Sequence, residues 1–345
     1  MPIMSSYQFP GVSILMPVRD AATTLPACLD SIMGQDYADY ELVVIDDHSS
    51  DDSRAVIKQY ALNDLRIKMY RNPGRGLVAA LNYGLAQCRS ELVARMDADD
   101  LMAPNRLSKQ VRHLQADTRL GLSASRVHLF PAHQITDGFR EYIRWQDQCI
   151  SPRQIANNIF VESPFAHPSV AFRRSAVLSL GGYLEGDFPE DYDLWLRMHQ
   201  AGHRMEKLPE QLLDWRDDAK RTSRSNPRYS REAFDRLRAE YLFRDPRIQR
   251  NRNNLAIWGA GRKTRRRCDH LLHQGINPRA WIDIDPRKIG NRIKGVPVVD
   301  SGWMSARVDR PFVLVYVTNH GARDLIAREL EQMGYRPGEQ YLAVG

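Results

Sequence analysis

The sequence predicts an α/β protein of two domains, a larger one built on a mostly parallel sheet and a smaller βαβ unit after it. Short runs rich in β-branched residues alternate with segments of helical periodicity along the first hundred residues, as in parallel strands joined by helices. A second alternating series begins near Asn253, after a polar, proline-containing stretch at 244–253. The chain has 345 residues, which is too long for one domain of the commonest size.

The first series predicts four strands separated by three helices. A helix opening at Thr23 or Thr24 has Pro26 in its first turn, where the missing N–H of proline costs no hydrogen bond. The next helix opens at Ser50 or Asp51, and a third runs over 76–88. The strands are predicted at 12–16, 41–45, 67–70 and 92–96.

The second series predicts a separable domain with its own parallel sheet. Its strands are expected at 255–258, 280–284 and 312–317, and its helices at about 263–274 and 322–333. The polar stretch before it is expected to be a linker. We therefore expect domains at 1–245 and 253–345.

Composition favours a globular enzyme inside the cell. Hydrophobic residues make up 43% of the chain and charged residues 26%. The apolar runs 12–18 and 312–317 are far shorter than the roughly 20 residues that span a bilayer. The first residues do not have the pattern of a signal peptide, and the four cysteines have no metal-binding or redox spacing. We expect a cytoplasmic protein with reduced thiols.

The positive charge is unevenly distributed. The formal net charge is +7, and Arg and Lys are concentrated between Arg216 and Arg267. Two interpretations stay open for this region: a solvated basic surface, and peripheral contact with anionic lipid at the inner face of a membrane. Because no DNA- or RNA-binding motif accompanies the charge, we expect no nucleic-acid partner.

Polar side chains follow the ends of three predicted strands. They lie at 17–20, 46–47 and 97–100. Ligands of open parallel sheets bind outside the carboxyl ends of the strands, so these segments are expected to form one site.

The run Asp97-Ala98-Asp99-Asp100 predicts a metal site. Residues i and i+2 of an extended chain point to the same side, so Asp97 and Asp99 can present two carboxylates to one cation. Mg²⁺ and Mn²⁺ prefer such oxygen ligands, often together with substrate phosphates. The alternative is an acidic loop in which Asp100 caps the helix expected after Pro104.

Two further segments carry candidate site residues. Glu190 and Asp191 open a predicted helix whose buried side includes Leu194, Trp195 and Met198. Acids there suit the helix dipole, and a carboxylate beside aromatic surface can also serve as a general base. His167 is either a substrate contact or a partly buried histidine with an internal partner, and Gly181-Gly182 predicts a tight turn.

Together these segments resemble the family-2 glycosyltransferases of the GT-A fold. The resemblance covers roughly residues 12–225 and rests on motifs in one order rather than on any single motif. In sequence they are Val-Ser-Ile-Leu-Met-Pro (12–17), Leu-Val-Val-Ile-Asp-Asp-His-Ser-Ser-Asp (42–51), Gly-Leu-Val-Ala-Ala-Leu-Asn (76–82), Met-Asp-Ala-Asp-Asp (96–100), Asn-Arg-Leu (105–107), the His-Pro-Ser segment (167–169), Gly-Gly-Tyr (181–183) and Glu-Asp-Tyr-Asp-Leu-Trp-Leu-Arg (190–197).

The resemblance implies a role for each matched residue. Pro17 and Arg19 would line the base pocket, and Asp47 would recognise the base. Asp97 and Asp99 look like the pair that holds ribose and a diphosphate-bound Mn²⁺ or Mg²⁺. Asp191 looks like the catalytic base of an inverting transfer. The donor implied is a nucleotide-diphosphate sugar, most simply a UDP-sugar, and the acceptor a glycan or a lipid-linked glycan in surface polysaccharide assembly.

The sequence departs from the family pattern at two places. Family members commonly carry Tyr-Asn where this chain has Arg19-Asp20, which leaves the base unassigned, although a guanidinium can stack on a flat ring. A histidine that often follows an aromatic-Arg pair is replaced by acids after Trp215-Arg216, so Arg216 or Arg221 would have to meet the diphosphate. The Gln-x-x-Arg-Trp motif of processive synthases is missing, which predicts one sugar per event.

The C-terminal series resembles dinucleotide-binding folds. Gly259-Ala260-Gly261 has two glycines of the fingerprint, Thr264 stands at the third, and Asp283 or Asp285 could be the ribose-binding acid. A Rossmann-like scaffold or sensor without dinucleotide is the favoured interpretation. Two alternatives to a transferase remain: an NAD(P)-dependent oxidoreductase and a non-catalytic sugar-nucleotide sensor.

Overall fold

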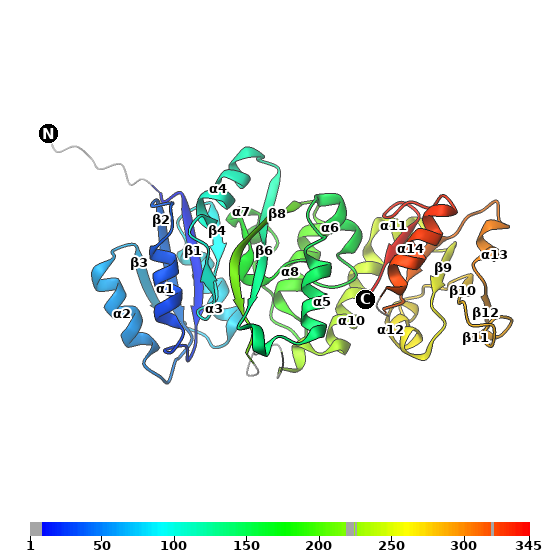
Figure 1. The fold of residues 1–345 in the computed structure, drawn as a ribbon, viewed down its shortest axis with the longest axis horizontal. Coiled ribbons are helices and arrows are strands. Elements are labelled where there is room, and N and C mark those ends of the chain that lie inside the picture. The colour runs from blue at the N-terminus through cyan, green and yellow to red at the C-terminus, as the bar shows by residue number, and fades with distance from the viewer. Residues whose placement is uncertain (1–8, 219–223, 225, 319–320) are drawn as a thin grey trace. The chain divides into compact units, whose positions relative to one another are not determined.

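The computed structural model describes residues 9–218, 224, 226–318 and 321–345, which form two compact units (Figure 1). The first unit consists of the described residues within Met1–Pro152, Phe165–Gly186 and Glu190–Ser225; the second consists of those within Arg153–Pro164, Asp187–Pro189 and Asn226–Gly345. The change of unit at Asn226 comes earlier than the predicted boundary between 245 and 253. That boundary concerns independent folding and stays a prediction.

The first unit is built on an eight-stranded sheet of order β3-β2-β1-β4-β7-β6-β8-β5. The first four strands of this order are parallel, and β7 is antiparallel to both β4 and β6. The mostly parallel half therefore comes from the alternating series that the sequence predicted. The strands are β1 (Val12–Val18), β2 (Tyr40–Asp46), β3 (Ile67–Arg71), β4 (Leu92–Arg95), β5 (Leu101–Met102), β6 (Leu120–Phe130), β7 (Ala171–Arg173) and β8 (Arg204–Arg216).

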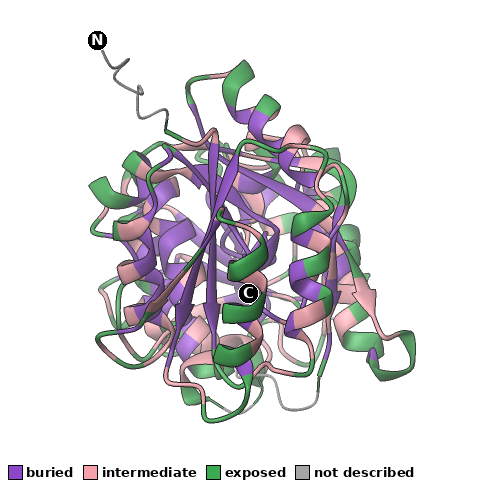
Figure 2. Ribbon diagram, turned by 90° about the vertical axis from the view of Figure 1, so that its left-hand side faces the viewer, coloured by how far each residue is buried: buried purple, intermediate pink, exposed green. Residues whose placement is uncertain are grey.

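Helices cover both faces of this sheet, and Figure 2 shows the buried strands enclosed by helices with exposed outer turns. Alternate residues of β1 and β2 pack in one core with the apolar sides of α1 and α2. On the other face α3 approaches closely: a Cβ added at Gly84 would lie 2.2 Å from the Leu15 side chain, so only glycine fits. The helices are α1 (Leu25–Met33), α2 (Ser53–Asn63), α3 (Leu77–Gln87), α4 (Arg106–Ala116), α5 (Asp137–Gln146), α7 (Arg174–Ser179) and α8 (Glu190–Gln200), with 3-10 turns at Ala132–Gln134 and His167–Ser169.

The predicted start of one helix and the alternative role of Asp100 as a helix cap were wrong for a shared reason. The helix expected at Ser50 or Asp51 begins at Ser53, because the Asp51 carboxylate accepts hydrogen bonds from the backbone N–H groups of Ala22 and Ser53. Asp100 does not cap the helix after Pro104, since α4 begins after Asn105. In both cases an acid that could start a helix is used instead to hold two loops together.

The second unit is a smaller parallel sheet of order β11-β12-β10-β9-β13-β14. Numbered along the chain without the short antiparallel β11, the strand order is 3-2-1-4-5, and the parallel pairing expected of a βαβ unit is present. The strands are β9 (Leu255–Trp258), β10 (Ala280–Ile282), β11 (Arg292–Ile293), β12 (Val296–Val299), β13 (Phe312–Val315) and β14 (Tyr341–Ala343). The helices are α6 (Pro152–Asn158), α10 (Arg231–Arg244), α11 (Pro246–Asn251), α12 (Arg262–Leu272), α13 (Gly302–Ser305) and α14 (Ala322–Gln332), with a 3-10 turn at Pro227–Tyr229.

The stretch expected to be a linker is largely helix α11, so that prediction was wrong. The Asp245 carboxylate caps α11 by accepting the Arg247 N–H at 2.8 Å, and Pro246 occupies the first turn. An Asp-Pro pair is a helix-start signal as well as a loop signal. Segment 153–164 also belongs to the second unit, where the Phe160 carbonyl accepts a hydrogen bond from the Gly345 N–H.

Part of the positive charge between Arg216 and Arg267 is paired with acids. The pairs formed by described residues include Arg224–Asp217, Arg238–Asp235, Arg244–Glu240 and Arg247–Asp245. Arg266 and Arg267 add longer contacts to Glu232 and Asp235. Arg244 and Arg266 are still 55% and 82% exposed, so these pairs lie in solvent and both interpretations of the region stay predictions. All four cysteines are buried and free, and no helix of the described chain has the length and apolar character to cross a membrane.

Candidate functional site

The carboxyl ends of β1, β2 and β4 bring the first predicted site segments together. The three strands are adjacent and parallel, with Val18 opposite Asp46 and Leu15 opposite Arg95. The backbone N–H of Asp47 donates to the carbonyl of Val18, which ties the two loops directly. The edge predicted from topology is thus present.

Asp47 is buried in a network of donors at this edge. Its carboxylate accepts hydrogen bonds from the Asn72 side-chain amide at 2.7 Å and from the Gly76 N–H at 3.0 Å. The exposed guanidinium of Arg19 lies 3.8 Å from the same carboxylate. Pro17 is buried in β1 two residues before Arg19. Arg19 and Asp47 are therefore in contact, and Pro17 lies in the strand that leads to Arg19.

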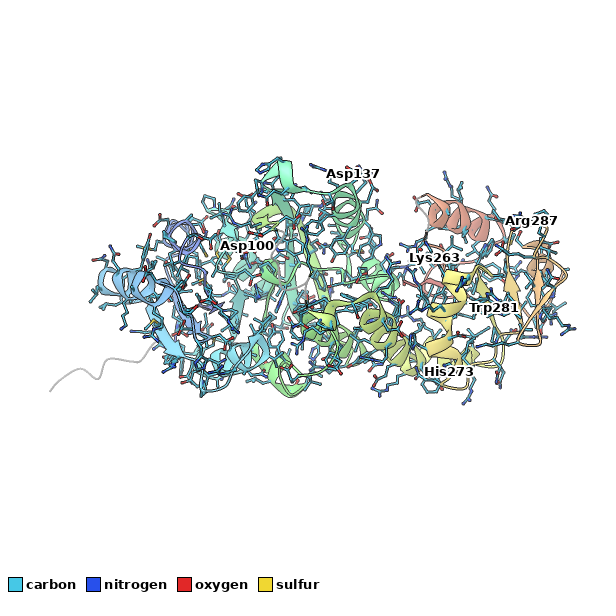
Figure 3. The ribbon with its side chains drawn as sticks, turned by 90° about the horizontal axis from the view of Figure 1, so that it is seen from below. Asp100, Asp137, Lys263, His273, Trp281 and Arg287 are labelled. Atoms are coloured by element: carbon cyan, nitrogen blue, oxygen red, sulfur yellow. The ribbon has the colours of Figure 1, made fainter. Side chains whose placement is uncertain are left out.

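The acidic run after β4 is a turn rather than an extended segment. The Asp100 N–H points back to the Asp97 carbonyl, and carboxylate oxygens of Asp97, Asp99 and Asp100 lie within 4.8 Å of one another. Asp97 and Asp99 are partly exposed, and Asp100, labelled in Figure 3, is buried. We expected Asp97 and Asp99 to point to the same side of an extended segment, and this geometry was wrong because the segment is a turn. The turn adds the carboxylate of Asp100 to the cluster. Three hard oxygen donors at this separation fit Mg²⁺ or Mn²⁺.

Arg95 is a member of the site that sequence reasoning missed. Its guanidinium is buried and forms an ion pair with Asp97. Burial acts to lower the pKa of Arg95, but the Asp97 carboxylate outweighs it, the pKa is raised and Arg95 stays charged. Arg95 stands on a strand otherwise made of apolar residues, and that position was the signal available in the sequence.

The acid pair at the start of α8 is held differently from the acidic turn. Asp191 is partly exposed, and its carboxylate accepts a hydrogen bond from the Tyr192 N–H at 2.7 Å. Burial and the neighbouring Glu190 carboxylate raise the pKa of Asp191, and Arg95 opposes them weakly. Asp193 is instead paired with Arg197 one turn later, at 2.7 Å. The sequence prediction of Leu194, Trp195 and Met198 as the buried side is correct.

His167 has an internal partner, as the second of its two interpretations requires. Its Nε2 lies 2.9 Å from the Tyr183 hydroxyl, and its ring packs edge-on against Trp195. Burial, together with the charge of Arg95, lowers the pKa of His167 well below its ordinary value, so the ring is neutral. Tyr183 is held by reciprocal hydrogen bonds with Asn82.

The glycine pair before Tyr183 forms the predicted tight turn. Gly181 and Gly182 have φ of 86° and 73°, and a Cβ at Gly182 would lie 2.5 Å from the Asn82 side-chain oxygen. The turn therefore needs glycine both for its conformation and for space.

Arg216, at the end of β8, lies against the acidic turn. Its backbone N–H donates to the Asp100 carboxylate and its Nε to the Asp99 carbonyl, both at 2.7 Å. The guanidinium also stacks over Phe130, 4.4 Å from the ring centre. Of the two arginines expected to meet a diphosphate, Arg216 is thus beside the acids, whereas Arg221 lies outside the described residues.

The two candidate ribose-binding acids of the partial dinucleotide fingerprint, Asp283 and Asp285, have hydrogen-bond or ion-pair partners within the protein. Gly259 has φ of 117°, as a tight turn after β9 requires. The Asp283 carboxylate accepts the Ala260 N–H at 2.8 Å and the Asp285 N–H at 2.9 Å, and Lys288 lies 3.1 Å away. Asp285 is paired with Arg287. Both acids therefore have structural partners within the second unit.

Comparison with known proteins gives one family. The model of glycosyl transferase family 2 matches residues 13–179. The O-antigen biosynthesis glycosyltransferase WbnJ of Escherichia coli is 32% identical over 237 residues, which cover 67% of this chain and 89% of that protein. The UDP-Gal:alpha-D-GlcNAc-diphosphoundecaprenol beta-1,3-galactosyltransferase of E. coli is 30% identical, over 68% of this chain and 83% of that protein.

Solved structures show the same fold. S. aureus TarS in complex with UDP-GlcNAc has a TM-score of 0.53 at 17% identity, covering 70% of this chain and 74% of TarS. The mannosyltransferase PcManGT of Pyrobaculum calidifontis, in complex with GDP-Man and Mn²⁺, has a TM-score of 0.50 at 20% identity, covering 78% and 70%. At these identities the likeness concerns the GT-A fold alone.

Proposed function

The chain belongs to glycosyltransferase family 2, and from this premise we propose that it transfers one sugar per event from a nucleoside diphosphate to an acceptor hydroxyl, with inversion at the anomeric carbon. The observation that carries the proposal is the arrangement in the first unit. This unit contains the buried Asp47, the turn with its three clustered carboxylates, and the partly exposed Asp191 with its raised pKa. These groups come from segments that are far apart in the sequence.

The donor nucleotide is proposed to bind against Pro17, Arg19 and Asp47. Asp47 is preoriented by Asn72 and Gly76, so it can accept a hydrogen bond from a base without reorganising. The exposed Arg19 guanidinium is free to stack on the base. A UDP-sugar is our first choice of donor, and Arg19 in place of an aromatic residue makes the base a question for a nucleotide screen.

Asp97, Asp99 and Asp100 are proposed to hold Mn²⁺ or Mg²⁺. When bound, such an ion neutralises the charge that develops on the diphosphate as it leaves. Arg95 has a distinct role, because its ion pair fixes the Asp97 carboxylate in position. We propose that Arg216, held against the same turn by two hydrogen bonds, contacts the diphosphate.

Asp191 is proposed as the general base. Its carboxylate takes the proton of the acceptor hydroxyl while that oxygen forms its bond to the anomeric carbon on the face opposite the diphosphate. The bond from the anomeric carbon to the diphosphate oxygen breaks in the same step, and the nucleoside diphosphate leaves with the electron pair. The raised pKa of Asp191 suits this role, because a base works best when its pKa lies near the working pH.

The acceptor is proposed to be a glycan or a lipid-linked glycan of surface polysaccharide assembly, as the names of the two relatives suggest. We place the reaction on the cytoplasmic side of the membrane, with peripheral contact through basic residues of 216–267. The oxidoreductase alternative loses its main support because Asp283 is occupied internally. The sensor alternative does not account for a candidate base at Asp191.

The test is a hydrolysis and transfer screen. Nucleotide sugars with different bases and sugars are incubated with the full chain and Mn²⁺, and release of free nucleoside diphosphate is measured. We expect one donor to be turned over, faster when a lipid-linked glycan is added. Binding of nucleotide sugars without any turnover, with or without acceptors, would favour the sensor instead.

A further inference from the structure

The second unit contains a cavity that the transfer reaction does not use. Its volume is about 370 Å³, and its lining comes from α12, from β10 and from the hairpin that joins β11 to β12. Small-molecule sites commonly measure roughly 300–1,000 Å³, so a ligand the size of a phosphate or diphosphate group fits with room to spare. None of its lining residues belongs to the glycine turn after β9.

Helical spacing explains how α12 presents several charges to the cavity. Arg265, Arg266 and Asp269 follow Arg262 by three, four and seven residues, which puts all four on one side of the helix. The chain turns back at Lys294, whose φ is 52°, and this brings the hairpin residues to the other side of the cavity.

The cavity lining is strongly cationic. Arg262, Arg265, Arg266, Arg292 and Lys294 line it together with one acid. Arg262, Arg266, Arg292 and Lys294 are exposed, so solvent screens their mutual repulsion, and their concave arrangement offers one anion several cationic donors at once. Elsewhere in the basic region some arginines, including Arg238 and Arg247, have acidic partners instead.

The internal partners of these cations are few. Asp269 is paired with Lys294 at 2.6 Å, so the one acid neutralises only one cation. Arg266 lies 3.6 Å from Glu232 through a side chain that is 82% exposed, which makes the contact weak. Among the described residues, Arg262 and Arg265 have no acidic partner.

Two buried donors in the lining strengthen the case. Trp281 is only 1% exposed, and its indole N–H has no hydrogen-bond acceptor in the described structure (Figure 3). The Nε–H of Arg265 is likewise buried without an acceptor among the residues described. An unpaired buried donor costs roughly 1–3 kcal/mol, and both donors line the same cationic cavity. A ligand with several acceptor oxygens and negative charge would satisfy them.

We propose that this cavity binds a phosphate or diphosphate group. The group would accept hydrogen bonds from the indole of Trp281 and the guanidinium groups of Arg262 and Arg265, with the hairpin cations closing the far side. Phosphate chemistry of this kind can come from a soluble phosphorylated metabolite or from the headgroup of an anionic lipid. The site is independent of the proposed donor site, which needs a divalent cation and lies in the first unit.

Calorimetry of the full chain with inorganic diphosphate tests the site. The titration is done in excess chelator with Asp99→Asn as the background, so that the proposed donor site does not contribute. We expect one binding event per chain. Arg262→Gln/Arg265→Gln should weaken it by roughly tenfold or more, because charge-assisted hydrogen bonds are lost. Trp281→Phe keeps an aromatic ring but removes the N–H, and should weaken binding several-fold.

Arg287→Gln/Arg336→Gln is the matched control. It also removes two guanidinium groups from the second unit, but both are largely exposed and outside the cavity lining. We expect diphosphate affinity within about twofold of the parent, since exposed charges are screened by solvent and salt. Thermal unfolding of every variant shows whether the fold is kept.

Vesicles separate the two sources of phosphate. Phosphatidylcholine vesicles with and without phosphatidylglycerol are tested for co-sedimentation with each variant. Binding of diphosphate that is lost only in the cavity variants supports a soluble ligand; vesicle binding lost in the same variants supports a headgroup. The proposal is overturned if neither probe binds, or if the cavity variants bind as tightly as the Arg287→Gln/Arg336→Gln control.

Discussion

The two units each place aspartates just beyond a parallel strand, yet the acids have opposite surroundings. After β4, carboxylate oxygens of Asp97, Asp99 and Asp100 lie within 4.8 Å of one another. After β10, Asp283 is surrounded by two backbone N–H groups and Lys288. Burial acts to raise the pKa of Asp283, but these donors and the lysine outweigh it and the pKa is lowered.

The difference shows that position in the fold does not by itself make a site. Ligands bind at the carboxyl edge of both kinds of sheet, so topology alone favours the two places equally. The two places differ in the partners of their carboxylates. Repulsion among the clustered acids of the first unit is relieved by a cation from outside, whereas Asp283 is already neutralised by Lys288 and by backbone N–H groups. The comparison predicts that removing an acid costs activity in the first unit and stability in the second.

The largest expected effect follows from changing Asp99 to asparagine. Asparagine keeps an oxygen but lacks the charge, so we expect metal-dependent donor binding to weaken strongly and transfer to fall by roughly 10³-fold. The measurement is the transfer rate and donor affinity over a range of Mn²⁺ concentrations. Full activity of the unmodified protein in excess chelator would remove the metal from the proposed mechanism.

A smaller loss is expected for Asp191→Asn. If Asp191 is the base, transfer should fall by roughly 10²-fold or more while donor affinity stays nearly unchanged, because the base acts on the acceptor. If Asp191 only stabilises the start of α8, the change should cost about 0.3–1 kcal/mol of stability and little activity.

Glu190→Gln is the matched control for Asp191, since it removes the adjacent charge and keeps the helix start. We expect a smaller loss of transfer than for Asp191→Asn, measured against calorimetric donor affinity in both variants. Transfer by Asp191→Asn within a few-fold of the unmodified rate would leave Glu190 or Asp193 as the candidate base.

The raised pKa of Asp191 also predicts that the transfer rate depends on pH. Burial and Glu190 raise the pKa of Asp191 to about 7, and only the deprotonated carboxylate accepts a proton. Transfer should therefore rise with pH up to about 7 and lose roughly tenfold for each unit of pH below it. Rates measured between pH 5 and 8 at saturating donor check this, and the acidic limb should vanish in Asp191→Asn. A flat profile in the unmodified protein would contradict the role of base.

Much of the fold was predictable from the sequence, because hydrophobic periodicity and the residue preferences of turns are local properties of the chain. β9 was predicted at its observed bounds, and the buried side of α8 was read from Leu194, Trp195 and Met198. The short strands β11 and β12 were missed, because β11 has only two residues and β12 contains a proline, which argues against a strand.

The candidate site was predicted in part, and its missing members depend on tertiary contacts. The acids at 97 and 99 were visible as a pattern, but the turn that adds Asp100 was not. The buried charge of Arg95 was hidden for a physical reason: its partner Asp97 lies outside the strand, and only the fold shows that the guanidinium is buried. The sequence did not show that Asp283 has internal partners, because its hydrogen-bond donors lie in a distant glycine turn and on a lysine five residues later.

The smallest effect on transfer is expected for Asp283→Asn, and it completes the comparison. The change removes the charge that pairs with Lys288 while keeping one acceptor for the Ala260 N–H, so we expect the transfer rate to stay within about twofold and stability to fall by about 1–3 kcal/mol. Because the folded-state pKa of Asp283 is lowered, its stabilisation is present above the unfolded-state pKa, near 4, and is lost as pH falls through the lower, folded value. The unfolding midpoints of variant and unmodified protein should therefore differ at pH 7 and converge in acid. Asp285→Asn is the control, since its partners Arg287 and Lys288 are 88% and 38% exposed and such surface pairs contribute little to stability. A large loss of transfer in Asp283→Asn with the midpoint unchanged would instead place Asp283 among the functional residues and end the contrast between the two units.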